Sequence, residues 1–409
     1  MAEDTLYDAA VIGAGPAGSA AANALARAGY RVVLADKAAF PRDKPCAEYL
    51  SPAAEPLLAE LGVLDELAAS DPARLRGFRI HAPNGSVFQG DFAATRDASG
   101  KSYYETGLAI PRLLLDAALV RAAVRAGAEL REGWRLAALQ REAGVWTLTP
   151  APDGGAIRAR LLIAADGVHS TVARRLALQI PGRMRKIALV AHMRGIAGLG
   201  DYGEMHVAGR RYVGLAPLEP HERGDLCNVA MVVDEARDGR TLAGRPQAFL
   251  LDALATFPRL RGRLAQVEVT RRTLTISRIS VRTRRCSGDG LLLVGDAAGY
   301  YDPFTGEGIY HALRSAQLAA EVAIPALAGD ALNAATLSRY DQLQRTEFRG
   351  KRTIEAIIQS AVQAPPLMSH IAAVMNRNPG MADTVVAVTG DFLPASAVLR
   401  PGYLLRLLV

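Results

Sequence analysis

The chain has 409 residues, half of them apolar and 22% charged, with a formal net charge of +7 and an isoelectric point of about 9.4. This length suffices for one large composite domain or for two or three smaller ones. The arginines are scattered along the chain instead of clustered, so the positive charge does not indicate a nucleic-acid-binding surface.

Three cysteines, Cys46, Cys227 and Cys286, are an odd number at wide spacing, which excludes a disulfide framework and a zinc site. The N-terminus lacks a basic segment followed by an apolar one, and no run of 18 apolar residues occurs. We therefore expect a cytoplasmic protein without a signal peptide, transmembrane helix or metal ion.

The stretch YDAAVIGAGPAGSAAANALARAGYRVVLADK, residues 7–37, predicts a strand, a helix and a second strand in that order. Residues 7–12 are short and apolar, residues 19–28 are rich in alanine, and residues 31–35 are again apolar. The turn between the first strand and the helix has the pattern GxGxxG. This order of elements is the one that a dinucleotide-binding loop requires.

Each glycine of this loop has a physical role. Gly13 permits a sharp turn, Gly15 removes a side chain that would hold the backbone away from a pyrophosphate, and Gly18 lets the helix lie close to the strand. Asp36 ends the second strand and can accept hydrogen bonds from ribose hydroxyls. The predicted dinucleotide contacts are Gly13, Gly15, Pro16, Ala17, Gly18, Asp36 and Lys37.

The next segment, FPRDKPCAEYLSP, places a free cysteine, a Glu-Tyr pair and several prolines soon after the phosphate-binding loop. Arg42 in this segment either contacts a phosphate or lies in solvent. Further along, runs such as GFRIHAP, GSVFQGDF, KIALVAHMRGI and DLCNVAMVVD alternate or are bounded by turns. They predict an antiparallel sheet built from residues 76–103 and 184–275.

Two further motifs lie far from the first. In ARLLIAADGVHSTVARRL, residues 159–176, an apolar strand leads to the turn Asp166-Gly167, which is either a cofactor contact or an ordinary strand-to-helix turn. In GDGLLLVGDAAGYYDPFTGEGIYHALRSAQLAAE, residues 288–321, a strand leads to Gly295-Asp296, and a helix is expected to begin near Ile309. The positive end of that helix dipole would stabilise negative charge on a bound cofactor.

Residues 331–409 are predicted to be mostly helical, with amphipathic spacing. The tail PGYLLRLLV is apolar with one arginine. It either docks on the core or contacts a membrane surface or a partner.

The order GxGxxG, Asp-Gly and Gly-Asp over residues 5–325 resembles the flavoprotein family of aromatic hydroxylases, flavin-dependent halogenases and geranylgeranyl reductases. The resemblance implies FAD as cofactor and an α/β fold. That fold has a Rossmann-like FAD-binding domain (1–75, 104–183 and 276–330), an inserted antiparallel β-sheet substrate domain (76–103 and 184–275) and a helical C-terminal region (331–409).

The same resemblance assigns further residues to the cofactor. It places Arg112 near the flavin and Leu136 beside the adenine, and it makes Lys44-Pro45-Cys46 similar to the Lys-Pro-Cys-Gly stretch of geranylgeranyl reductases, with Ala47 in place of the glycine. Cys46 then packs against the flavin, assists catalysis, or is inert core. The contacts expected from the resemblance are Arg42, Cys46, Ala47, Arg112, Leu136, Asp166, Gly167, Gly295, Asp296, Pro303, Gly306, Gly308 and Ile309.

The substrate is expected between the inserted sheet and the flavin. The stretch YVGLAPL keeps the tyrosine and proline of a motif that geranylgeranyl reductases use for lipid, but lacks its tryptophan, and Tyr212 is a candidate catalytic residue beside Cys46. Other candidates for the pocket are Tyr103, Tyr104, His206, Arg211 and His221.

Several functions stay open. The first is an FAD-dependent oxidoreductase of the geranylgeranyl reductase-like branch acting on an apolar isoprenoid or polyketide-like small molecule. The second is a monooxygenase that uses NAD(P)H as electron donor and hydroxylates an aromatic or polyketide secondary metabolite, and the third is a non-catalytic flavin-binding protein. A halogenase would carry a Trp-x-Trp-x-Ile-Pro stretch, which Trp134 and Trp146 do not form.

Overall fold

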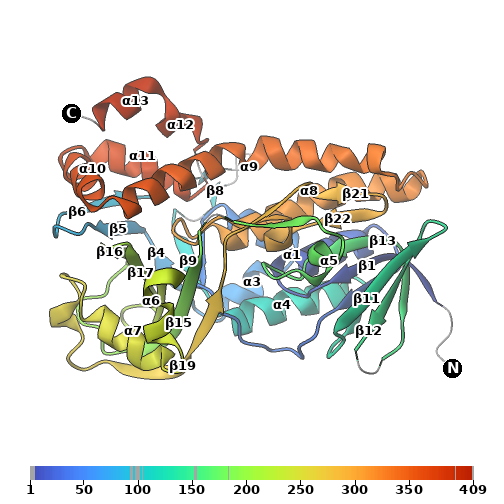
Figure 1. Ribbon diagram of the computed structural model, residues 1–409, viewed down its shortest axis with the longest axis horizontal. Coiled ribbons are helices and arrows are strands. Elements are labelled where there is room, and N and C mark those ends of the chain that lie inside the picture. The colour runs from blue at the N-terminus through green and yellow to red at the C-terminus, as the bar shows by residue number, and fades with distance from the viewer. Residues whose placement is uncertain are drawn as a thin grey trace.

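A computed structural model of the chain describes residues 5–92, 95–96, 102–103, 105–151, 154–182, 184–391 and 393–407. Two large sheets lie side by side, and helices of the C-terminal region run over both (Figure 1). This mixed α/β architecture confirms the predicted fold class.

The first large sheet has eight strands in the order β10-β2-β1-β13-β12-β11, with β22 pairing with β13 and β21. Strands β10, β2, β1, β13 and β22 run parallel, and the apolar residues of β2, β13 and β22 and most of those of β1 are buried, as expected for strands covered on both faces. The strands are β1 (Leu6–Ile12), β2 (Val32–Ala35), β10 (Glu129–Arg131), β11 (Leu136–Glu142), β12 (Val145–Pro150), β13 (Ile157–Ala164), β21 (Ser287–Gly288) and β22 (Leu291–Leu293).

Helices α1 (Pro16–Arg27), α4 (Arg112–Arg125) and α8 (Gly308–Ala328) pack together against this sheet. Their contacts use small residues: α1 is rich in alanine and nearly all of it is buried. Because α1 and α8 both begin at the carboxyl edge of the parallel strands, their N-termini converge on one side of the sheet, where ligands bind in folds of this kind.

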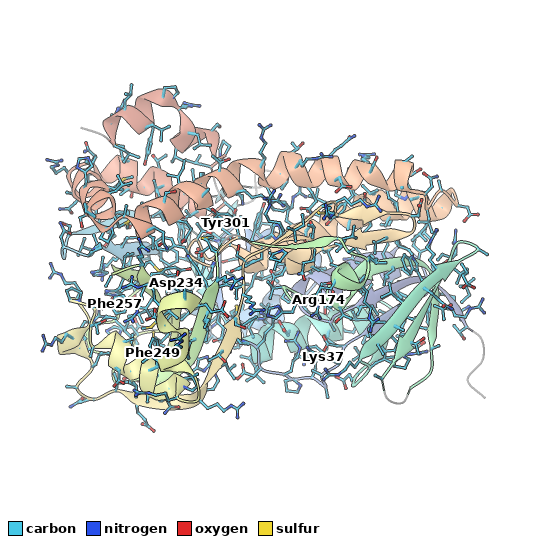
Figure 2. All side chains as sticks on the ribbon, viewed as in Figure 1. Lys37, Arg174, Asp234, Phe249, Phe257 and Tyr301 are labelled. Atoms are coloured by element: carbon cyan, nitrogen blue, oxygen red, sulfur yellow. The ribbon has the colours of Figure 1, made fainter. Side chains whose placement is uncertain are left out.

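The second large sheet has seven strands in the order β19-β15-β18-β17-β16-β5-β6. One face packs on α6 (Glu235–Leu242) and α7 (Pro246–Leu254), through a cluster that includes Phe249 and Phe257 (Figure 2). The strands are β5 (Gly77–His81), β6 (Val87–Asp91), β15 (Lys186–Arg194), β16 (Tyr202–Ala208), β17 (Arg211–Pro217), β18 (Cys227–Asp234) and β19 (Glu268–Ser277).

The prediction of a purely antiparallel second sheet was wrong at one pair, because β5 and β16 run parallel. These two strands are far apart in the sequence and no hairpin connects them, so turn geometry does not impose an antiparallel direction. The predicted strands are otherwise present in the expected segments.

Smaller elements connect the large sheets. A three-stranded sheet pairs β9 with β3 and β4, and β14 pairs with β20. These elements are β3 (Tyr49–Leu50), β4 (Ala73–Leu75), β7 (Thr95–Arg96), β8 (Ser102–Tyr103), β9 (Gly107–Ala109), β14 (Gln179–Pro181), β20 (Val281–Thr283), α2 (Ala54–Glu60), α3 (Leu64–Ala68), α5 (Thr171–Arg175), and the 3-10 helices η1 (Arg261–Arg263) and η2 (Gly295–Ala298).

The C-terminal region is helical, as predicted. Helix α9 crosses the molecule from the first sheet to the second, where α10 and α11 pack near β6 (Figure 1). Among the described residues, no helix combines the length and apolar character needed to cross a membrane. The helices are α9 (Ala334–Gln363), α10 (Pro365–Arg377), α11 (Pro379–Thr389), α12 (Ser396–Leu399) and α13 (Pro401–Arg406).

Candidate functional site

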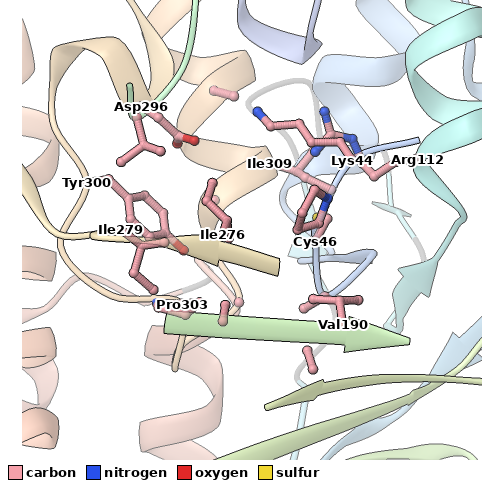
Figure 3. A pocket seen from close by; sticks show the side chains of 18 of the residues that line it. Lys44, Cys46, Arg112, Val190, Ile276, Ile279, Asp296, Tyr300, Pro303 and Ile309 are labelled. Carbon is pink, nitrogen blue, oxygen red and sulfur yellow. The ribbon is translucent and has the colours of Figure 1, made fainter. Parts of the chain in front are cut away.

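A cavity lies where the N-termini of α1 and α8 meet one face of the second sheet; we call it the central cavity. It has an empty volume of about 1190 Å³, including the part open to solvent. Lys44, Cys46, Arg112 and Ile309 gather on one side, Asp296 and Tyr300 on another, and Val190 and Ile276 come from strands below (Figure 3). Segments of the FAD-binding part and strands of the second sheet therefore build it together.

The glycine loop before α1 is held by backbone contacts that no larger residue would allow. Gly13 has a φ of +102°, and a Cβ there would lie 2.4 Å from the carbonyl oxygen of Ala165. A Cβ on Gly18 would lie 1.8 Å from the oxygen of Gly13. Both glycines therefore set the loop geometry but do not line the cavity, as a tight turn and close helix packing require.

Gly15, at the start of α1, faces two guanidinium groups. A Cβ on Gly15 would lie 3.4 Å from Arg42 Nη2 and 3.8 Å from Arg112 Nη2. Both arginines share the fully buried carboxylate of Asp116, at 3.1 Å for Arg42 and 2.7 Å for Arg112. Two cations and one anion thus stand beside unpaired N–H groups of a helix, which is an anion-binding arrangement.

Lys44 adds a third cation. Its Nζ is 3.6 Å from the position of a Cβ on Gly167. Burial, and then the charge of Arg112, lower the pKa of Lys44. Burial alone would lower the pKa of Arg112, but Asp116 and the nearby Cys46 raise it overall. An anion placed among these groups would relieve the repulsion between the cations.

Asp36 closes the glycine loop. Its Oδ2 accepts a hydrogen bond from Ala14 N at 2.8 Å and its Oδ1 one from Ala38 N at 2.9 Å. The buried carboxylate lies at the end of β2 and outside the residues that line the central cavity. Lys37 is exposed and Leu136 belongs to the hydrophobic core of the first sheet. The ribose and adenine contacts of these residues stay predictions.

The Asp-Gly turn does two things. Asp166 Oδ2 accepts from the amides of Thr171 at 2.6 Å and Val172 at 3.2 Å, which caps α5. Its Oδ1 is buried and has no hydrogen-bond partner among the described residues, and burial raises the pKa of this carboxyl group. An unpaired buried oxygen is costly, so a hydroxyl donor from a ligand would stabilise it.

Gly295 and Asp296 form η2 at the edge of the cavity. Gly295 has a φ of +56°, and a Cβ there would lie 2.9 Å from Ala17 Cβ. No hydrogen bond to the Asp296 carboxylate is formed within the described part of the chain, so it is available to ligand hydroxyls. Helix α8 begins at Gly308, one residue before its predicted start, and points its N-terminus at the cavity.

The segment from Cys46 to Tyr49 joins the cofactor side to the second sheet. Cys46 lines the cavity; its Sγ accepts from Glu48 N at 3.3 Å and its carbonyl oxygen from Asn228 Nδ2 at 2.9 Å. The fully buried Glu48 carboxylate binds His192, Asn228, Arg271 and the amide of Arg112. No local sequence pattern indicates this network, because its members are brought together from strands β15, β18 and β19.

Three tyrosines line the central cavity, and they differ in their partners. Tyr212 donates to Asp302 Oδ1 at 2.6 Å, and Asp302 is also paired with Lys186 at 2.7 Å. The Tyr49 hydroxyl is buried and has no hydrogen-bond partner among the described residues. Burial raises the pKa of Tyr49, Tyr212 and Tyr300 well above the usual value, so all three hydroxyls keep their protons.

The other pocket candidates lie elsewhere. His206 lies on the face of β16 that points away from the central cavity, where it binds Glu204. Arg211 pairs with Asp238, and His221 is exposed. Because side chains alternate along a strand, Met205 lines the cavity instead of its neighbour His206. The side chain of Tyr103 and all of Tyr104 lie outside the described residues.

The structure thus brings most of the predicted cofactor residues together. Those that line the central cavity are Gly15, Pro16, Ala17, Cys46, Ala47, Arg112, Gly167, Gly295, Asp296, Pro303, Gly306, Gly308 and Ile309. Those that do not are Gly13, Gly18, Asp36, Lys37, Arg42, Leu136 and Asp166. The glycine cradle, the three cations and the unpaired Asp166 oxygen fit a flavin dinucleotide: Gly15, Arg42, Lys44 and Arg112 would hold the pyrophosphate, and Asp166 and Asp296 sugar hydroxyls.

A second cavity, the apolar cavity, lies between the second sheet and helices α9–α13. Its empty volume is about 1020 Å³, including solvent-open space. Its lining side chains are hydrocarbons or thioethers, apart from those of Thr305, Thr389 and Tyr403. The Tyr403 hydroxyl donates a hydrogen bond to Met381 O at 2.7 Å. Met205 borders both cavities. This cavity was not predicted from the sequence.

Comparison with known proteins agrees with this geometry. The sequence matches the family described as "FAD binding domain" over residues 6–351. It is 29% identical over 425 residues to Conditioned medium factor receptor 1 of Dictyostelium discoideum, covering 98% of this chain and 79% of that protein.

Two reductases are also similar. Menaquinone reductase of Mycobacterium tuberculosis is 32% identical over 349 residues, covering 79% of this chain and 78% of that protein. Digeranylgeranylglycerophospholipid reductase 1 of Methanopyrus kandleri is 31% identical over 369 residues, covering 88% of this chain and 91% of that protein. The solved structure of a flavoprotein/dehydrogenase from Cytophaga hutchinsonii superposes with a TM-score of 0.80 at 21% identity, covering 94% of this chain and 93% of that chain. The two proteins therefore share the same fold.

Proposed function

The chain belongs to the FAD-binding domain family and is an FAD-dependent oxidoreductase, and within that family we propose that it reduces carbon–carbon double bonds of an apolar, isoprenoid-like substrate. The observation that carries this proposal is the apolar cavity beside the central cavity. The similarity to a digeranylgeranylglycerophospholipid reductase over most of both chains supports the same substrate class.

The partition between the two cavities is thin and apolar. Met205 borders both, and so does the loop before α8: Pro303 and Gly306 line the central cavity, while Phe304 and Thr305 between them line the apolar one. A hydrocarbon chain held in the apolar cavity would therefore need only a small shift of Met205 or this loop to present one end beside the cofactor. Methionine adapts readily to such a shift.

The sheet wall of the central cavity also suits a hydrocarbon. Ala188, Val190, Ala230 and Val232 line it with small apolar side chains, and Gly214 leaves room above the strand. An aromatic substrate for hydroxylation needs polar partners that orient it. Among the described residues of this wall the polar side chain is Tyr212, whose hydroxyl is already bonded to Asp302. The geometry favours reduction of an alkene over hydroxylation of an aromatic ring.

When bound and reduced, the flavin supplies a hydride. That hydride would form a C–H bond at one alkene carbon as the π bond breaks, and the other carbon would take a proton. Tyr49 carries the hydroxyl best suited to hold that proton, since it is buried, protonated and without a protein partner in the described structure. The apolar walls exclude water from the reacting atoms.

The proposal is tested by reducing the holoprotein with light under anaerobic conditions and adding a polyprenyl lipid in detergent. Flavin reoxidation together with a gain of two hydrogen atoms per reduced double bond, seen by mass spectrometry, is the expected result. Ala361→Trp, which fills the apolar cavity, should lower turnover on long chains at least about tenfold. Thr353→Trp on the exposed side of α9 is the matched control.

The alternative is a monooxygenase. Rapid mixing of the photoreduced protein with oxygen would then give a transient absorbance distinct from oxidised and reduced flavin, and an aromatic compound would gain an oxygen atom. That outcome, with no reduction of polyprenyl lipid, would overturn the proposal. NAD(P)H as electron donor stays a prediction and is checked by anaerobic bleaching of the flavin on its addition.

A further inference from the structure

Helices α12 and α13 cover the outer side of the apolar cavity; we call residues 396–406 the lid. Leu399, Tyr403 and Leu404 of the lid, together with the following Leu407, line the cavity. Tyr403 donates to Met381 O, and His370 Nε2 contacts Leu407 O at 3.0 Å. The lid is thus a short amphipathic cover with its inner face on the cavity, fixed by few polar contacts.

The outer side of this region exposes apolar side chains. Leu405 of α13 is 62% exposed, the highest value among the large hydrophobic residues that the structure shows exposed. Ile357, Leu367 and Leu393 are exposed at about 40%, so four of the eight such residues in the described structure lie in the C-terminal region. Ile357 also lines the apolar cavity, which places an opening of the cavity at this surface. Exposed apolar side chains beside the mouth of an apolar cavity indicate an interaction site.

The charge of the same surface favours an anionic partner. From Leu393 to Leu407 the sequence has no acidic residue, and Arg400 and Arg406 are exposed. Arg377, at the end of the adjacent α10, is exposed as well. In the segments that precede the lid, Asp391 is paired with Lys351, and Asp383 of α11 is exposed and accepts a hydrogen bond from Asp91 N at 3.0 Å. Basic residues around exposed leucines are typical of segments that rest on anionic lipid.

We propose that the lid and the neighbouring ends of α9 and α10 dock on an anionic phospholipid bilayer, so that an apolar chain passes from the bilayer into the cavity beneath. Leu405 enters the acyl region while Arg400 and Arg406 face the phosphates. The membrane occupant is preferred over a second copy of the chain because the rim is basic, and basic rims repel each other across a symmetric contact. The route of entry rests on the proposed function; the docking itself does not.

The test is sedimentation of the holoprotein with vesicles of phosphatidylcholine containing phosphatidylglycerol, and with pure phosphatidylcholine vesicles. We expect binding to the anionic vesicles that weakens with salt. Leu405→Glu should weaken it at least about tenfold. Leu251→Glu is the control, because Leu251 is also exposed but lies on α7, which is at the bottom of Figure 1 while the lid is at the top.

The charged rim is tested in the same way. The double variant Arg400→Glu/Arg406→Glu should lose roughly tenfold or more in affinity for anionic vesicles, and Arg240→Glu/Arg261→Glu, in exposed residues of the α6–η1 region, should lose little. Equal binding of Leu405→Glu and Leu251→Glu, or no binding of the unmodified protein, overturns the proposal. A concentration-dependent dimer that Leu405→Glu abolishes, without vesicle binding, would assign the surface to a second copy.

The results of the vesicle-binding experiments can be distinguished from those that test the proposed alkene reduction. Vesicle binding needs no turnover, so it stands or falls independently of alkene reduction. If both proposals hold, Leu405→Glu keeps its activity on detergent-dispersed lipid and loses it on lipid in vesicles. If the reaction is wrong, no lipid is reduced in either form, while vesicle binding persists.

Discussion

Oε2 of Glu48 lies 2.5 Å from Nε2 of His192, although the two residues are 144 positions apart in the sequence. The same carboxylate accepts hydrogen bonds from Asn228 Nδ2 at 2.7 Å and from the Arg112 amide at 3.0 Å, and Arg271 Nη1 lies 3.2 Å away. Burial would raise the pKa of Glu48, but His192, Arg112 and Arg271 lower it overall. This one side chain therefore ties the cofactor domain to the second sheet.

Replacing Glu48 by alanine should lower the free energy of unfolding by about 3–5 kcal/mol, because Arg271, Asn228 and the Arg112 amide lose their partner in a buried site. Urea unfolding followed by circular dichroism measures it. Glu222→Ala, at an exposed position, is the control and should change little. If Glu48→Ala and Glu222→Ala unfold alike, the network does not hold the two parts together.

Gly15→Val should leave the protein folded but lower its affinity for FAD at least about tenfold. The valine would occupy the space in front of Arg42 and Arg112 where the pyrophosphate is expected. Flavin fluorescence during titration of the apoprotein measures the affinity. Gly200→Val is matched to it, since a Cβ on Gly200 meets nothing within 4 Å. Unchanged FAD affinity in Gly15→Val would place the pyrophosphate elsewhere.

Tyr49→Phe and Tyr212→Phe should have opposite effects. The Tyr49 hydroxyl has no protein partner among the described residues, so its loss should leave stability nearly unchanged and lower the rate of substrate reduction by about a hundredfold. The Tyr212 hydroxyl is held by Asp302, so its loss should cost about 1 kcal/mol of stability and affect the rate less.

Both tyrosine variants are compared by urea unfolding and by single-turnover reoxidation of the photoreduced flavin with substrate. A reversed order of rates, with Tyr212→Phe the slower, would restore Tyr212 as the catalytic residue predicted from the sequence. Cys46→Ala belongs in the same series. Similar rates in Cys46→Ala and the unmodified protein would leave the cysteine a packing role against the flavin.

The protein should lose stability in mild acid because of a buried histidine pair. His81 and His206 stack with ring centroids 4.0 Å apart, beside Glu204, Arg259 and Arg263. Burial, and then His206, lower the pKa of His81 to about 4. The unfolded chain therefore binds more protons than the folded protein between about pH 6.5 and pH 4. The stability that neutral, buried His81 contributes is complete above pH 6.5 and is lost as the pH falls below it.

Between pH 7 and pH 5 the free energy of unfolding should fall by about 2 kcal/mol through His81 alone. Burial lowers the pKa of His206 as well, so His206 adds to this loss. The difference in urea stability between the unmodified protein and His81→Gln, taken at each pH, isolates the effect from that of other groups. A difference that stays constant from pH 7 to pH 5 would show that His81 does not titrate in this window.

Much of the cofactor site could be predicted from the sequence, because its determinants are local. A strand, a glycine turn and a helix follow one another within about thirty residues, and the turn conformation depends on those residues themselves. Gly15, Gly167, Gly295 and Gly308 therefore all line one cavity, as their motifs indicated. Helical periodicity likewise predicted the C-terminal helices.

The sequence could not predict which face of each strand meets the cavity. His206 and Met205 are neighbours, and a shift of one residue exchanges their faces, so only the packing of β16 decides that Met205 lines the site while His206 pairs with Glu204. The same holds for Glu48, whose partners come from three separate strands.

The chain by itself determined that a dinucleotide is bound and roughly where, since phosphate binding uses backbone groups of one continuous segment. Only the tertiary structure decided what lies beside the cofactor. The apolar cavity joins residues near Phe78 to residues near Leu404, and such contacts depend on how distant elements pack, which no local pattern encodes.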